Sequence, residues 1–148
     1  SADGATWRQD LATAPFTPRA FATALVYEDR IWLVGGYIGG LSTASNQIWS
    51  SADGSNWLQV SSSTAPMRWG SAGVVFDNRM WLLGGRDSAN NQSNQVYYSI
   101  DGATWVQSAT LPEARSEAAA LFANNQMWLI GGSVPGVVSN NDVLYSNP

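Results

Sequence analysis

The sequence predicts an all-β fold built from three copies of one unit of short strands. Three markers return in step along the 148 residues. The motif Ser-x-Asp-Gly-x-x-Trp occurs at residues 1–7, 51–57 and 99–105. An apolar run that ends in Gly-Gly occurs at residues 31–36, 80–85 and 127–132. A single arginine precedes the first glycine of each pair by sixteen residues, at Arg19, Arg68 and Arg115. Because all three markers keep a period of 47 to 50 residues, we interpret the chain as an internal repeat.

The first two strands of each unit are predicted to form a tight hairpin. In the first unit, residues 20–27 are small and apolar, and Arg30–Val34 is rich in β-branched and aromatic residues. Glu28 and Asp29 lie between them and can turn the chain. The same pattern recurs in the other two units, so we expect three such hairpins.

The rest of each unit is predicted to supply two more strands. Residues 37–45 are polar and indicate a loop, and residues 46–50 indicate a third strand. Asp53-Gly54 favours a turn with positive φ, and Trp57 opens a fourth strand. Ala65-Pro66 then suits a connection to the next unit, because proline is excluded from central strands. We expect no helix.

Four antiparallel strands in every repeat are typical of the blades of a β-propeller. Each blade buries both faces against its neighbours, which accounts for eight tryptophans in so short a chain. We expect a single repeat array over residues 1–148. Its parts are blade one at 19–60, blade two at 68–108, blade three at 115–146 and a fourth-strand segment at 1–10.

Composition limits the class of protein. The chain is 45% apolar and 12% charged, which suits one globular core, and its net charge is -4 with no lysine or histidine. A nucleic-acid partner is therefore not expected. No cysteine is present and no apolar run is long enough to span a membrane, so we expect a soluble, cysteine-free protein of unassigned location with no membrane partner.

The repeat resembles the kelch repeat over the whole chain. Four apolar positions precede Gly-Gly, an aromatic follows at Trp49 or Tyr97, and a tryptophan comes after it. The resemblance implies that the glycine pair ends the second strand and that the tryptophan lies in the fourth. The structural markers of the repeat are Gly35, Gly36, Gly84, Gly85, Gly131, Gly132, Trp7, Trp57 and Trp105. Leu144 departs from the pattern, although Tyr145 follows it.

Three blades are too few to close a propeller. An open arc would expose apolar faces and sheet edges. Residues 1–10 are a fourth strand without its blade, and the blade at 115–146 lacks a fourth strand. We therefore expect a homodimer through strand exchange that closes as a six-bladed ring. The ends fall on repeat boundaries, so we interpret the chain as an engineered or excised half-propeller, the alternative being a natural fragment of a longer chain.

One face of the ring is predicted to hold a mouth. The candidate ligand-binding residues there are Arg19, Arg68, Arg115, Tyr37, Arg86, Ser133 and Trp69. The kelch resemblance implies that such arginines bind an acidic peptide or small anion. In the alternative interpretation, each arginine pairs with backbone carbonyls or with acids such as Glu113 or Glu117 and holds the blades in register. Trp69 could stack on a sugar or peptide, or only pack.

An enzymatic function is not expected. Without histidine, lysine or cysteine the chain has no Ser-His-Asp triad, no Schiff-base lysine and none of the usual zinc or copper ligands. We assign no catalytic residue, metal or cofactor, and the preferred function is a non-catalytic, self-assembling half-propeller. A peptide- or anion-binding module is one alternative. A fragment of a glycan-acting extracellular enzyme is another, because the three arginines resemble the carboxylate-binding arginines of sialidases.

Overall fold

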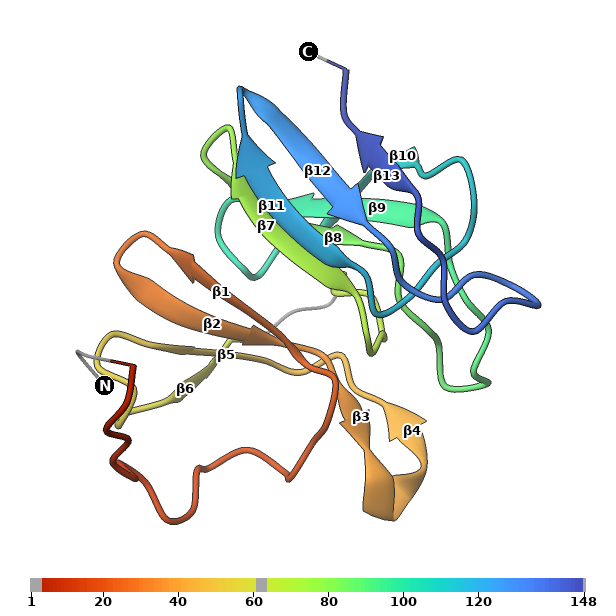
Figure 1. Ribbon diagram of the computed structural model, residues 1–148. Coiled ribbons are helices and arrows are strands. Elements are labelled where there is room, and N and C mark those ends of the chain that lie inside the picture. Colours follow the sequence, from red (N-terminus) through yellow and green to blue (C-terminus); the bar gives the residue numbers. More distant parts are fainter. Residues whose placement is uncertain (1–3, 61–63, 148) are drawn as a thin grey trace.

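The computed structural model describes residues 4–60 and 64–147, and within them the regular secondary structure is almost all β-strand, joined by turns and loops (Figure 1). The first sheet has the order β1-β2-β5-β6, formed by β1 (Thr23–Tyr27), β2 (Arg30–Val34), β5 (Ile48–Ser51) and β6 (Leu58–Val60). The second has the order β7-β8-β9-β10, formed by β7 (Ala72–Phe76), β8 (Arg79–Leu83), β9 (Gln95–Ser99) and β10 (Val106–Thr110). Each is an antiparallel meander.

The third sheet has only three strands among the described residues. They are β11 (Ala119–Ala123), β12 (Gln126–Ile130) and β13 (Val143–Tyr145). β13 pairs with β12 on one side, and its other side is a sheet edge. Two blades of four strands are therefore followed by one that lacks its outermost strand.

The predicted hairpins form with two-residue turns. Tyr27 pairs with Arg30, so Glu28 and Asp29 make the turn, with φ of 49° and 55°. The same positions in the other blades are Asp or Asn, and these also have positive φ. Short polar side chains tolerate this left-handed conformation, which matches the twist of a hairpin.

The segment at 37–45 differs from the expected loop. It forms a small hairpin of β3 (Tyr37–Ile38) and β4 (Thr43–Ala44), joined by a 3-10 turn, η1 (Gly39–Leu41). This three-residue 3-10 turn is the single helical element among the described residues, so the all-β prediction is confirmed. The turn closes because Ser42 adopts φ of 49° and donates its amide to the Gly39 carbonyl.

The first strands of the three blades lie side by side: β7 contacts both β1 and β11, as Figure 1 also shows. Two apolar clusters fill the spaces between blades. The first includes Trp32, Met80 and Trp105, and the second includes Trp81 and Leu129. Each cluster draws residues from two consecutive blades, so the core is divided into inter-blade layers rather than lying within one blade.

The Gly-Gly pairs join one blade to the next. Gly35 has φ of +65°, and a Cβ there would lie 2.4 Å from the carbonyl oxygen of Arg68. The amide of Gly36 donates to that same oxygen at 2.9 Å. Gly84 and Gly85 make the equivalent contacts with the carbonyl of Arg115. Only glycine combines this φ with so close an approach.

Residues 4–10 form no strand in this chain, and the described side chains there are exposed. The predicted fourth strand at 1–10 is therefore not formed within the chain, and its first three residues lie outside the described part. Among residues 4–60 and 64–147, no helix has the length and apolar character that crossing a membrane requires.

Candidate functional site

The repeat arginines are bound within their own blades. Arg19 donates from Nη1 to the Gly35 carbonyl at 2.9 Å and from Nη2 to Oε1 of Gln47. Arg68 donates to Oε1 of Gln95 in the same way. These contacts link the start of a blade to its second and third strands. They match the alternative in which the arginines are structural.

Arg115 is the most enclosed of the three. Its side chain is 1% exposed and makes a bidentate pair with Asp142, at 2.7 and 2.9 Å, together with a bond to the Gly131 carbonyl at 3.2 Å. Hydrogen bonds from Arg115 hold the pKa of the Asp142 carboxyl below its usual range. Neither Glu113 nor Glu117 pairs with it; Glu117 lies 3.7 Å from Arg86 instead.

The other predicted mouth residues come together in one cluster. Tyr37 and Trp69 have ring centroids 5.6 Å apart. Arg86 lies over the Trp69 ring, with its Cζ 5.4 Å from the centroid, and donates to the hydroxyls of Ser116 and Ser133 at 2.9 and 3.1 Å. The structure thus places Tyr37, Trp69, Arg86 and Ser133 next to one another along the loops of the three blades.

Beside these residues is a hollow of about 340 Å³. It is lined by Phe21, Tyr37, Ser42, Trp69, Ser88 and Asn90. Phe21, whose ring centroid lies 5.3 Å from that of Trp69, was not predicted from the sequence. The repeat gives no signal for Phe21, because its counterparts at the same distance after the repeat arginines are Gly70 and Glu117. The hollow can offer aromatic faces and hydroxyl groups to a ligand.

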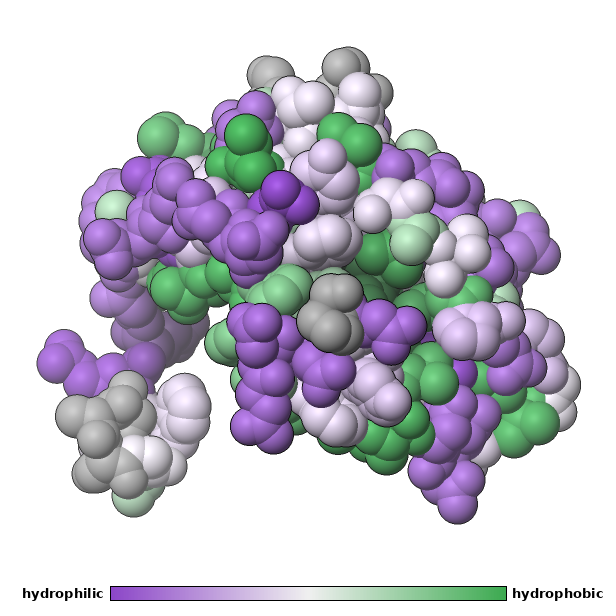
Figure 2. Space-filling view, turned by 90° about the horizontal axis from the view of Figure 1, so that it is seen from above, coloured by the Kyte–Doolittle hydropathy of each residue, from purple (hydrophilic) through white to green (hydrophobic). Residues whose placement is uncertain are grey.

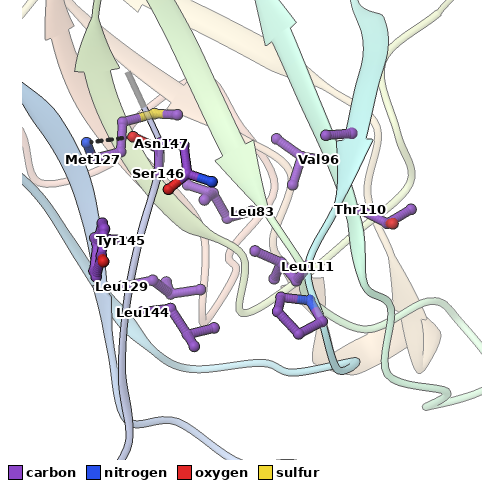
Figure 3. A pocket seen from close by; sticks show the side chains of 12 residues that line it. Leu83, Val96, Thr110, Leu111, Met127, Leu129, Leu144, Tyr145, Ser146 and Asn147 are labelled. Atoms are coloured by element: carbon purple, nitrogen blue, oxygen red, sulfur yellow. Dashed lines mark hydrogen bonds between the residues drawn. The ribbon is translucent and has the colours of Figure 1, made fainter.

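A second cavity, of about 410 Å³, lies between blades two and three (Figure 3). Its wall is largely apolar, with Leu83 and Val96 from blade two and Met127, Leu129 and Leu144 from blade three. Tyr145, Ser146 and Asn147 close the side formed by β13. The cavity therefore opens where a fourth strand of blade three would run, and no sequence motif indicated it.

The two ends of the arc expose apolar side chains. Seen from above, hydrophobic residues reach the surface in several patches among hydrophilic ones (Figure 2). The exposed large apolar side chains on the strands of the end blades include Val26, Ile31, Leu58, Leu121, Phe122, Ile130, Val143 and Tyr145. The repeat tryptophans follow the same trend, because Trp105 is buried, Trp57 is half-buried and Trp7 is 79% exposed.

Comparison with known proteins identifies the same architecture. A family model described as the DUF6242 beta propeller domain matches residues 1–145. A curated relative, the kelch repeat protein M-T8 of Myxoma virus (strain Lausanne), is 29% identical over 89 residues, which are 60% of this chain and 17% of the viral protein. The solved structure of YjhT superposes with a TM-score of 0.74 at 17% identity, over 89% of this chain and 43% of that one. The chain thus spans less than half the length of either protein.

Proposed function

The chain belongs to the DUF6242 beta propeller domain family, and we propose that its main property is non-catalytic self-assembly. In this proposal, two copies close head to tail into a six-bladed, kelch-like ring. Propellers close with roughly four to eight blades. Three blades per chain reach that range with two copies, whereas three copies would give nine. The observation that carries the proposal is the apolar face that each end of the arc leaves uncovered.

The outer face of blade three supports the proposal most directly. Leu121, Ile130 and Val143 are 42%, 41% and 52% exposed. The side chains at the same positions of blades one and two are at most 8% exposed: Leu25 and Val74, Val34 and Leu83, and Ile48 and Val96. The repeat therefore supplies apolar residues for an interface that blade three does not make within this chain.

The outer face of blade one is the matching half. Ile31 is exposed there, whereas its counterpart Met80 is fully buried against blade one. Val26 is likewise exposed, and its counterpart Val75 packs in the layer between blades one and two. Blade two packs on blade one through Met80 and Val75, the counterparts of Ile31 and Val26. Blade one of a second copy can therefore pack on blade three in the same way. Such a contact is head to tail, and two of them close a C2 ring.

The glycine pair of blade three also lacks its usual neighbour. In blades one and two, the carbonyl of the next repeat arginine accepts from Gly36 or Gly85. Within the described chain, the amide of Gly132 has no such arginine carbonyl opposite it. A Cβ added at Gly131 would approach only the Asn140 carbonyl oxygen, at 3.0 Å. In the proposed ring, the carbonyl of Arg19 from the second copy takes this place.

Sedimentation equilibrium of residues 1–148 with two charge substitutions tests the proposal. Ile130→Glu places a charge on the blade-three face, and we expect it to convert a dimer into monomers of 15.9 kDa. Leu41→Glu is the matched control, because Leu41 is 69% exposed in the η1 turn of blade one. A wild-type chain that remains monomeric at micromolar concentration contradicts the proposal and favours a piece of a longer propeller chain.

A second candidate function is ligand binding at the mouth, favoured by the Phe21, Tyr37 and Trp69 hollow. The expected ligand is an acidic peptide or small anion that contacts Arg86 while an apolar or aromatic part stacks on Trp69. Titration with an acidic peptide should perturb the fluorescence of the wild type and not that of Trp69→Phe. An unchanged affinity in Trp69→Phe would argue against this site.

A further inference from the structure

We infer that the cavity between blades two and three is the binding site for Trp7 of a second copy of the chain. The inference rests on the proposed ring and adds the residue that each copy contributes to the other.

The cavity is the repeat counterpart of the space that Trp105 fills between blades one and two. Trp105 is 4% exposed and belongs to a cluster that includes Val34, Ile48, Met80 and Leu82, with Ala65 and Tyr97 packed against it. One repeat further along the chain, these six positions are Leu83, Val96, Met127, Leu129, Leu111 and Leu144. All six line the cavity of about 410 Å³. What is missing is the tryptophan.

Trp7 is the tryptophan that fits this space, because it ends the first Ser-x-Asp-Gly-x-x-Trp motif of the chain, as Trp105 ends the third. Trp7 donates its indole N–H to the Gly4 carbonyl at 3.2 Å, as Trp105 does to the Gly102 carbonyl at 3.0 Å. Gly4 and Gly102 both have φ of +72°. The N-terminal segment thus already has the turn of a docked fourth strand while its indole is exposed, and such preorganisation lowers the cost of binding.

The same chain does not bring Trp7 to its own cavity. Asp10 accepts a hydrogen bond from the Ser55 hydroxyl of blade one. Phe16 packs edge-on against Trp49 and Trp57, with centroids 5.8 and 5.3 Å away. The N-terminal segment therefore packs on blade one, whereas the cavity is lined by residues of β13. Figure 1 shows that β13 lies in the blade at the other end of the arc. The occupant is accordingly a second copy.

Polar groups in the cavity also suit the docked strand. The backbone N–H of Trp105 donates to Oγ1 of Thr64 at 2.7 Å. The counterpart of Thr64, two residues before the connecting proline, is Thr110, which lines the cavity. In the complex, Thr110 would accept from the backbone N–H of Trp7, and the free edge of β13 would pair with residues 8–10.

Two variants test the inference by complementation. Trp7→Ala removes the occupant, and Leu144→Trp fills the cavity from its own wall. Each variant alone should dimerise at least 100-fold more weakly than wild type, because buried tryptophan anchors dominate interfaces. An equimolar mixture should restore part of the affinity, because one junction then pairs an intact Trp7 with an intact cavity. Leu41→Ala, an exposed apolar side chain in the η1 turn, is the control and should leave dimerisation unchanged.

The outcomes separate this inference from the proposed ring. A wild-type monomer contradicts both. A dimer whose affinity is unchanged by Trp7→Ala contradicts only the cavity assignment, and so does a mixture that dimerises no better than either variant alone. Because Trp7 is exposed in the single chain, the circular dichroism spectrum of Trp7→Ala should match that of the wild type at concentrations where both are monomeric.

Discussion

Replacing Arg115 with methionine should be far more damaging than replacing an exposed arginine. The Arg115 guanidinium is enclosed, and it ties the start of blade three to Asp142 before β13 and to Gly131 after β12. Methionine fills similar volume but cannot donate. The carbonyl and the carboxylate would then lose their partner inside the blade.

The magnitude follows from these contacts. Removing one partner of a buried ion pair costs about 3–5 kcal/mol. Asp142 is 36% exposed and can recover part of its hydration, so we expect the lower end, about 3 kcal/mol. Arg79 pairs with Asp77 at 3.6 Å with both side chains well exposed, so Arg79→Met should cost about 1 kcal/mol or less.

Urea denaturation followed by tryptophan fluorescence, at one fixed protein concentration, measures both variants. With a slope of about 2 kcal/mol/M, Arg115→Met should lower the midpoint by about 1.5 M and Arg79→Met by under about 0.5 M. Equal midpoints for the two variants would refute a structural role for Arg115. Wild-type stability with lost binding of an acidic peptide would instead favour the ligand interpretation of the repeat arginines.

Two further predictions concern a turn glycine and acid. Gly102→Ala places a Cβ 2.0 Å from the Trp32 ring, whereas Gly54→Ala meets only Ile31 at 3.9 Å, and both glycines have positive φ. Thermal unfolding should therefore show a loss about 1–3 kcal/mol larger for Gly102→Ala, and equal losses would argue against this contact. The pKa of Asp142 is lowered by the Arg115 hydrogen bonds, and that of Asp101 by amide hydrogen bonds from Thr104 and Ala103. Depressed carboxyl pKa values contribute stability that is complete above about pH 5 and lost as pH falls through about 4 and below. Urea midpoints of the wild type should fall over this range and those of Asp142→Asn should fall less; parallel curves would contradict the assignment.

The strands and their order could be predicted from the sequence because they depend on local signals. The β-branched and aromatic residues at 30–34 and the polar two-residue turns specify the hairpins without reference to distant residues. The period of the repeat then places equivalent strands in equivalent blades. The hairpin at 37–44 escaped prediction because its two-residue strands are held by the contact of Tyr37 with Ala20 rather than by an apolar pattern.

The site was harder to predict because its contacts join residues far apart in the chain. Arg115 was predicted to lie at the mouth, but no sequence pattern indicated that Asp142, 27 residues away, is its partner. The Phe21 ring and the inter-blade cavity depend on packing between blades, and no single motif encodes that packing. The layer between blades one and two contains Trp105, whereas the corresponding space between blades two and three is a cavity. This difference depends on the three-dimensional packing of the blades.

Native mass spectrometry of residues 1–148 tests the central claim, that two arcs close one ring, most directly. The account predicts one dominant species of 31.8 kDa, twice 15.9 kDa, that persists as concentration rises because a closed ring leaves no free end. A species of 15.9 kDa alone, or a ladder of ever larger oligomers, would contradict it.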